Sequence, residues 1–114
     1  MASKSAANED VTITSDEING TAVVVVRGEI DVASAPELRT QLHELCAAGA
    51  PSVAVDLRSV TFLDSSALGV LVGALRRCRE NDTAFKLVID SPRLLKIFEI
   101  TGLTSVFEIT DKLD

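Results

Sequence analysis

The sequence predicts an α/β domain with a mixed β-sheet, and three observations lead to this class. Apolar runs of strand length alternate with segments of helical periodicity, in the order β-β-α-β-α-β-α-β. The first two strands are separated by Asn19-Gly20, a dipeptide typical of tight β-hairpins. Strands joined through helices run parallel, with right-handed crossovers. We therefore expect a sheet of four to five strands, an antiparallel hairpin followed by parallel strands, packed with three to four helices.

The predicted strands are short and rich in Val and Ile. The hairpin begins at Val11, where apolar and polar residues alternate, and continues after the turn as Thr21 to Val26. This second run is almost wholly apolar, which is typical of a strand buried on both faces. We expect Gly28-Glu29-Ile30-Asp31 to end it. The later strands are predicted at Val53 to Leu57, Phe85 to Ile89 and Val106 to Ile109.

Each predicted helix has a start signal. The first, Ala35 to Ala48, is expected to begin with a capping box, in which the Ser34 hydroxyl accepts a hydrogen bond from the Glu37 amide. The second follows Asp64-Ser65-Ser66 and has an apolar stripe made of Leu68, Leu71, Val72 and Leu75. The third is capped by Ser91, has Pro92 at its first position and ends at Gly102.

Length and composition restrict both the organisation and the function. The chain of 114 residues fits one domain, predicted at residues 11–114 after a small, polar and disordered tail of residues 1–10. A net charge of −6 disfavours nucleic acid and anionic membranes as partners. Neither a signal peptide nor an apolar run of the ~20 residues that a spanning helix needs is evident, so we expect a cytoplasmic protein. With His43 as the single histidine, we expect no metal site, no cofactor and no enzymatic activity.

The two cysteines, Cys46 and Cys78, lie on the apolar stripes of the first two predicted helices. Buried cysteines commonly behave as small hydrophobic residues, which is one interpretation of the pair. The alternative is a redox switch. It requires the helices to bring the two Cα atoms within roughly 4.4–6.8 Å, which the sequence does not decide.

The segment Asp64-Ser65-Ser66 carries the strongest functional signal. It lies between a predicted parallel strand and a helix, where α/β proteins commonly place their sites. The unpaired N–H groups and positive dipole end of a helix start would favour a phosphate there. Phosphorylation would add about −1.5 to −2 charges beside Asp64, which would disrupt close docking and leave the fold intact. The same residues are also typical of an ordinary helix N-cap, and no Gly-x-Ser-x-Gly motif indicates a nucleophile.

Four motifs follow one another along the chain: Gly28-Glu29-Ile30-Asp31, Val55-Asp56-Leu57, Asp64-Ser65-Ser66-Ala67-Leu68-Gly69-Val70, and the Ser91-Pro92 helix that ends Ile100-Thr101-Gly102-Leu103. Together and in this order they resemble the STAS domain of bacterial anti-sigma factor antagonists. The similarity spans about Val11 to Ile109. The family pattern usually has Gly at the position of Ala67.

The resemblance implies partner switching in a bacterial stress response. Such proteins bind an anti-sigma factor, which is also a serine kinase, and so free a sigma factor. The kinase phosphorylates the serine after the Asp, which corresponds to Ser65, and a metal-dependent serine phosphatase reverses the modification. Asp31 would lie near the phosphoserine, and Asp31, Asp64, Ser66 and Leu68 would contact the partner.

Two other functions remain open from the sequence. STAS-like chains also serve as accessory subunits of ABC-type lipid transport complexes, without a phosphorylation cycle. A small enzyme or nucleotide-binding protein is disfavoured, since the chain has no Gly-x-x-x-x-Gly-Lys loop and no His or Cys constellation. The identity of the partner distinguishes the first two hypotheses, and a titration with ATP and GTP tests the third.

Overall fold

A computed structural model describes residues 11–113 and confirms the predicted class; the tail of residues 1–10 lies outside the described residues. Five strands form one sheet, three α-helices pack on it, and a short 3-10 helix, η2, follows the third. The elements are β1 (Val11–Ile18), β2 (Thr21–Ile30), α1 (Ala35–Ala47), β3 (Ser52–Leu63), α2 (Ser65–Glu80), β4 (Ala84–Val88), α3 (Pro92–Ile100), η2 (Leu103–Ser105) and β5 (Glu108–Thr110).

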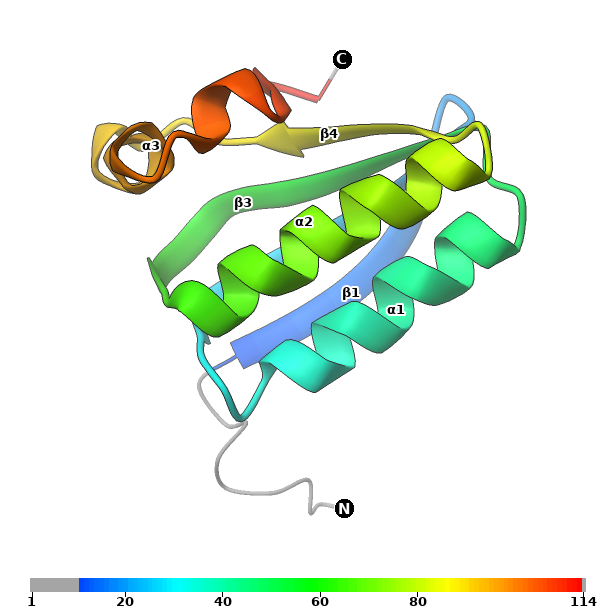
Figure 1. Cartoon of the computed structure of the whole chain (residues 1–114). Helices are drawn as coiled ribbons and strands as arrows, with labels where there is room; N and C mark the ends of the chain where they lie inside the picture. The colour runs from blue at the N-terminus through cyan, green and yellow to red at the C-terminus, as the bar shows by residue number, and fades with distance from the viewer. Residues whose placement is uncertain (1–10, 114) are drawn as a thin grey trace.

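The strands lie in the order β1-β2-β3-β4-β5. β1 and β2 are antiparallel and every later pair is parallel, as predicted. Figure 1 shows α1 and α2 side by side across one face of the sheet, with α3 beyond the end of β4. None of the helices within residues 11–113 is long and apolar enough to cross a membrane.

The hairpin turn has the predicted geometry. Asn19 and Gly20 have φ angles of 52° and 84°, both in the left-handed region, and Ile18 pairs with Thr21 across the turn. A two-residue turn with positive φ at both positions matches the twist of the flanking strands. This turn therefore sets the register of β1 on β2.

Two strands are longer than the sequence predicts. β2 does not end before Gly28 but continues to Ile30, and β3 continues past Leu57 to Leu63. Gly28, with φ of 95°, lies where the pairing of β2 with β3 shifts by a residue, as in a β-bulge. The apolar runs marked only the buried parts of the two strands, whereas their mutual backbone pairing extends further.

The predicted capping box of α1 is wrong. The Ser34 hydroxyl accepts a hydrogen bond from the Asp31 N–H (3.1 Å), and the Glu37 carboxylate accepts one from the Gln41 side chain (3.3 Å). The backbone of Ser34 is already near-helical (φ −101°, ψ −15°), so its side chain does not act as a cap. Ser91 has the extended backbone of an N-cap and accepts from the Leu94 N–H (3.2 Å), as predicted.

The main core lies between the sheet and the three helices. Val24 of β2, Val55 of β3 and Leu71 of α2 are fully buried there. A smaller cluster of Val23, Ala54 and Val88 occupies the opposite face of the sheet. Since Val23 and Val24 face opposite sides and both are buried, the prediction that β2 is buried on both faces is confirmed.

Cys46 and Cys78 form a disulfide that joins α1 to α2. Both residues are fully buried, and their Cα atoms are 5.2 Å apart, within the range that a disulfide needs. The two cysteines are therefore a covalent cross-link between the helices and not separate small hydrophobic residues.

Candidate functional site

The candidate site lies where β2 and β3 end together. The last pair of these strands is Ile30 with Leu63, and the Asp64 N–H donates a hydrogen bond to the Ile30 carbonyl (3.2 Å). This bond holds the start of α2 against the end of β2. The loop that begins at Asp31 and the helix that begins at Ser65 are consequently neighbours at the C-terminal ends of β2 and β3.

Asp64 caps α2. Its backbone is extended (φ −103°, ψ −174°), and its Oδ1 accepts a hydrogen bond from the Ala67 N–H (3.2 Å). Its carbonyl accepts from the Leu68 N–H (3.1 Å), which is the first bond of the helix. The N-cap interpretation of the Asp-Ser-Ser segment is thus confirmed for Asp64.

Ser65 is the first residue of α2, and its side chain is exposed. Because Asp64 provides the cap, the Ser65 hydroxyl is not needed to start the helix. The leading N–H groups of a helix lack intrahelical acceptors, and the aligned peptide dipoles make this end positive. An anion attached to Ser65 would therefore meet a favourable local field, opposed by the Asp64 carboxylate.

Asp31 shapes the loop next to Ser65. Its Oδ1 accepts hydrogen bonds from the N–H groups of Ala33 (3.0 Å) and Ser34 (3.3 Å), and its carbonyl accepts from Ala35 (2.8 Å). The carboxylate thus stabilises the tight turn into α1, as an Asx-turn does. One carboxylate oxygen of Asp31 is thus already occupied by this turn.

The other predicted contact residues differ in accessibility. Ser66 is half-buried, and Leu68 is a partly buried residue that packs against the main core. Ala67 between them is fully buried, so a small residue suits this position. Of the α2 residues singled out in the sequence, Ser65 is the most open to a partner.

Two exposed apolar side chains near the ends of β2 and β3 were not identified as candidate site residues from the sequence. Val32, in the loop after Asp31, is 72% exposed, and Phe62, near the end of β3, is 49% exposed. They belong to the two chain segments that the Ile30–Leu63 pair brings together. The signal was available, since Val32 is an apolar residue in a turn. We call Val32, Phe62, Asp64 and Ser65 the Ser65 surface.

The shifted titratable groups described in residues 11–113 lie outside this surface. A hydrogen bond from the Arg58 side chain lowers the pKa of Asp56, and the pair lies in the middle of β3. Partial burial and the charges of Arg39 and Arg77 lower the pKa of His43, which is half-buried on α1. Ser65 itself presents an exposed hydroxyl at the start of α2.

Comparison with known proteins gives concordant similarities. Residues 12–114 match the family model of the STAS domain. The anti-sigma-B factor antagonist of Bacillus subtilis (strain 168) is 40% identical over 89 residues, which cover 78% of this chain and 81% of the relative. The counterpart from Staphylococcus aureus (strain NCTC 8325 / PS 47) is 35% identical over 88 residues, or 77% and 82% of the two chains.

Two solved structures are similar in fold. The anti-sigma factor antagonist from Mycobacterium paratuberculosis has a TM-score of 0.84 and 31% identity, over 91% of this chain and 88% of that one. The unphosphorylated form of the anti-sigma factor antagonist SpoIIAA has a TM-score of 0.71 and 20% identity, over 90% of each chain. At this lower identity the second similarity concerns the fold alone.

Proposed function

The chain belongs to the STAS domain family, and we propose that it is an anti-sigma factor antagonist switched by phosphorylation of Ser65. In its unmodified form it binds an anti-sigma factor that is also a serine kinase, and a sigma factor is thereby released. The cycle takes place in the bacterial cytoplasm. The observation that carries the proposal is the exposed Ser65 hydroxyl at the start of a long helix whose cap is provided by another residue.

The Ser65 surface has the composition of a protein-docking surface. Val32 and Phe62 are exposed apolar side chains in segments adjacent to Ser65, and apolar and aromatic anchors supply much of the binding energy at protein interfaces. Asp31 and Asp64 hold their turns by hydrogen bonds, so the backbone of the surface is ordered before a partner binds. A pre-ordered surface loses less conformational entropy on association.

Phosphorylation would change the charge of this surface without unfolding it. The kinase transfers the γ-phosphoryl group of ATP to the Ser65 oxygen, ADP leaves, and the hydroxyl proton is released. The product carries about −1.5 to −2 charges at the helix start, which stabilise an exposed helix terminus by ~0.3–1 kcal/mol. The same dianion beside Asp64 must lose its hydration on docking, and this cost opposes binding.

The chain itself is a substrate and a binding partner in this cycle. A serine phosphatase hydrolyses the phosphoserine and restores the binding form. The named relatives are regulatory antagonists, which agrees with a chain that performs no catalysis. Its net charge of −6 opposes direct binding to nucleic acid or to anionic membranes.

The proposal is tested by affinity capture from a lysate of the source bacterium with wild-type, Ser65→Ala and Ser65→Glu baits. We expect wild type and Ser65→Ala to retain a kinase-like anti-sigma factor and Ser65→Glu to lose it. Incubation of the captured kinase with ATP should phosphorylate wild type and Ser66→Ala, but not Ser65→Ala, as read by mass spectrometry.

Thr104→Glu is the matched charge control, because Thr104 is an exposed residue of η2 outside the Ser65 surface and the substitution adds the same charge there. It should bind as wild type does. Capture of the same partners by all three Ser65 baits would refute the switch. If those partners included a transporter ATPase, the accessory-subunit hypothesis would replace the hypothesis of an anti-sigma factor antagonist.

A further inference from the structure

The second half of β3 has a free backbone edge. β4 pairs with β3 only from Ser52 to Asp56, whereas β2 follows β3 to Leu63. Within residues 11–113, no strand therefore pairs with 58–63 on the side away from β2. Alternate residues of a strand direct their N–H and C=O groups to each edge, and an unpaired edge is a template for another strand.

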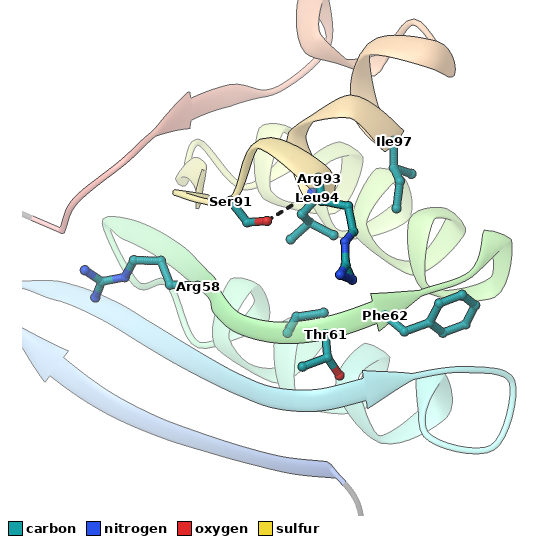
Figure 2. A pocket seen from close by; sticks show the side chains of 8 residues that line it. Arg58, Thr61, Phe62, Ser91, Arg93, Leu94 and Ile97 are labelled. Carbon is teal, nitrogen blue, oxygen red and sulfur yellow. Dashed lines mark hydrogen bonds between the residues drawn. The ribbon is translucent and has the colours of Figure 1, made fainter.

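A groove runs along this free edge, between β3 and α3 (Figure 2). Its volume is about 350 Å³, at the small end of the range for ligand sites in proteins. We call it the β3 groove, and its lining residues are Arg58, Val60, Thr61 and Phe62 from β3, and Ser91, Arg93, Leu94 and Ile97 from the α3 segment.

The β3 groove has an apolar floor with an open aromatic side. Val60 and Leu94 are 7% and 4% exposed and form part of the main core, so they present a fixed apolar surface. Phe62 is half-exposed and Ile97 half-buried. Side chains of a strand that pairs with β3 would alternate between the two faces of the sheet. Those on the helix-covered face would pack against this floor.

One guanidinium of the groove is available to a ligand. The Arg58 guanidinium donates to both Asp56 oxygens (2.9 and 2.8 Å), and Figure 2 shows it pointing away from Arg93. Figure 2 also shows the Arg93 side chain extending from α3 toward β3. In the part of the chain that the structure describes, the sole ion pair is Arg58–Asp56, so Arg93 has no carboxylate partner there.

We propose that the β3 groove binds an extended segment of a partner protein, which adds to the free edge of β3 as a further strand. The segment carries an apolar side chain that packs on Val60 and Leu94, and a carboxylate that pairs with Arg93. Main-chain hydrogen bonds provide the affinity in this mode of recognition and side-chain pockets provide the selectivity. The site does not require Ser65 and is present whether or not Ser65 is phosphorylated.

The test uses a blocked hexapeptide in which valine alternates with threonine and the last residue is aspartate. Two further versions are N-methylated, each on one of the two alternate sets of amides. In a strand added to β3, one set faces β3 and the other faces solvent. We expect the parent peptide to shift the amide signals of residues 58–62 in NMR spectra of the full chain and to protect those amides that face the free edge of β3.

Under the same conditions, one methylated version should bind at least about tenfold more weakly and the other should bind as the parent does. Equal binding by both methylated versions would overturn strand addition. The proposal would also fail if the peptide caused no change at millimolar concentration, or if the changes fell on the outer edges of β1 or β5.

The carboxylate contact has its own pair of variants. Arg93→Gln should weaken the aspartate peptide about five- to tenfold and leave a peptide ending in asparagine unchanged. Lys96→Gln is the matched control, since Lys96 is an exposed cation of α3 outside the groove. An equal loss of affinity for both peptides would show that Arg93 does not pair with the carboxylate of the ligand. Ser65→Glu should bind the peptide as wild type does, which separates this outcome from that of the Ser65 switch.

Discussion

The two halves of β3 differ although they belong to one continuous strand. From Val53 to Asp56 the strand lies between β2 and β4, and its residues are almost completely buried. From Arg58 to Phe62 it has β2 on one edge only, and all but Val60 are exposed. The change occurs where β4 ends at Val88 and the chain turns toward α3.

This difference shows that the neighbours of a strand decide whether it is buried framework or an exposed edge. The first half is held by strands on both edges and by apolar side chains on both faces. The second half is anchored by β2 alone, and it leads directly to Asp64 and Ser65. A rigid framework that ends in an exposed edge can place a docking surface without large motions on binding.

The disulfide belongs to the framework side of this comparison, and its removal should give the largest effect. α1 ends just before β3 begins, and α2 ends just before β4 begins, so Cys46 and Cys78 lie near the first half of β3. Closing a loop of 32 residues stabilises the folded chain by about 3–4 kcal/mol in the chain-entropy model. In urea titrations we expect the unfolding free energy of the reduced chain to be lower than that of the oxidised chain by this amount.

The double variant Cys46→Ala/Cys78→Ala provides the control, because its stability should not respond to reductant. Reducing cytoplasm keeps most cysteines as thiols, so capture of partners should be compared with the oxidised and the reduced chain. Both forms should bind the same partners, since the Ser65 surface is at the other end of α2. A reduced chain as stable as the oxidised one would show that the cross-link contributes nothing to the framework.

Truncations in the two halves of β3 should separate stability from binding. Val55→Ala removes two methyl groups from a fully buried site and should cost about 2 kcal/mol of unfolding free energy. Phe62→Ala removes a half-exposed ring and should cost less than about 1 kcal/mol. Partner capture should show the reverse order, with Phe62→Ala defective and Val55→Ala retained. A loss of stability in Phe62→Ala as large as in Val55→Ala would contradict the division of the strand.

The sequence predicted the framework half better than the exposed half. Val53 to Leu57 was identified because a buried strand needs a run of apolar residues. Arg58, Ser59 and Thr61 interrupt that run, so the remainder of β3 was missed. Hydrogen bonds to β2 extend the strand there, and backbone pairing leaves no trace in composition. The capping box failed for a related reason, since the Ser34 hydroxyl is used by the Asp31 amide.

The candidate site was predicted in position but not in full. Asp64 and Ser65 stood out because a capping residue before an apolar periodic stretch marks a helix start. Val32 and Phe62 were missed, since the exposure of an apolar side chain depends on which segments lie together in the fold. The β3 groove depends on where β4 stops relative to β3, which the local pattern does not determine.

The smallest effect is expected at Asp56, at the junction of the two halves. The hydrogen bond from Arg58 lowers the pKa of Asp56 in the folded chain relative to the unfolded one. The stabilisation is therefore present above the ordinary pKa of an aspartate and is lost as the pH falls through the folded value. Because Arg58 is about one-third exposed, we expect Asp56→Asn to cost only about 1 kcal/mol of unfolding free energy at neutral pH.

Urea titrations between neutral and strongly acidic pH should show this difference between wild type and Asp56→Asn shrinking below pH ~4. Asp90→Asn, an exposed carboxylate that also acts on Arg58, should change stability much less. A difference between wild type and Asp56→Asn that stayed constant down to strongly acidic pH would mean that the ion pair does not hold the junction.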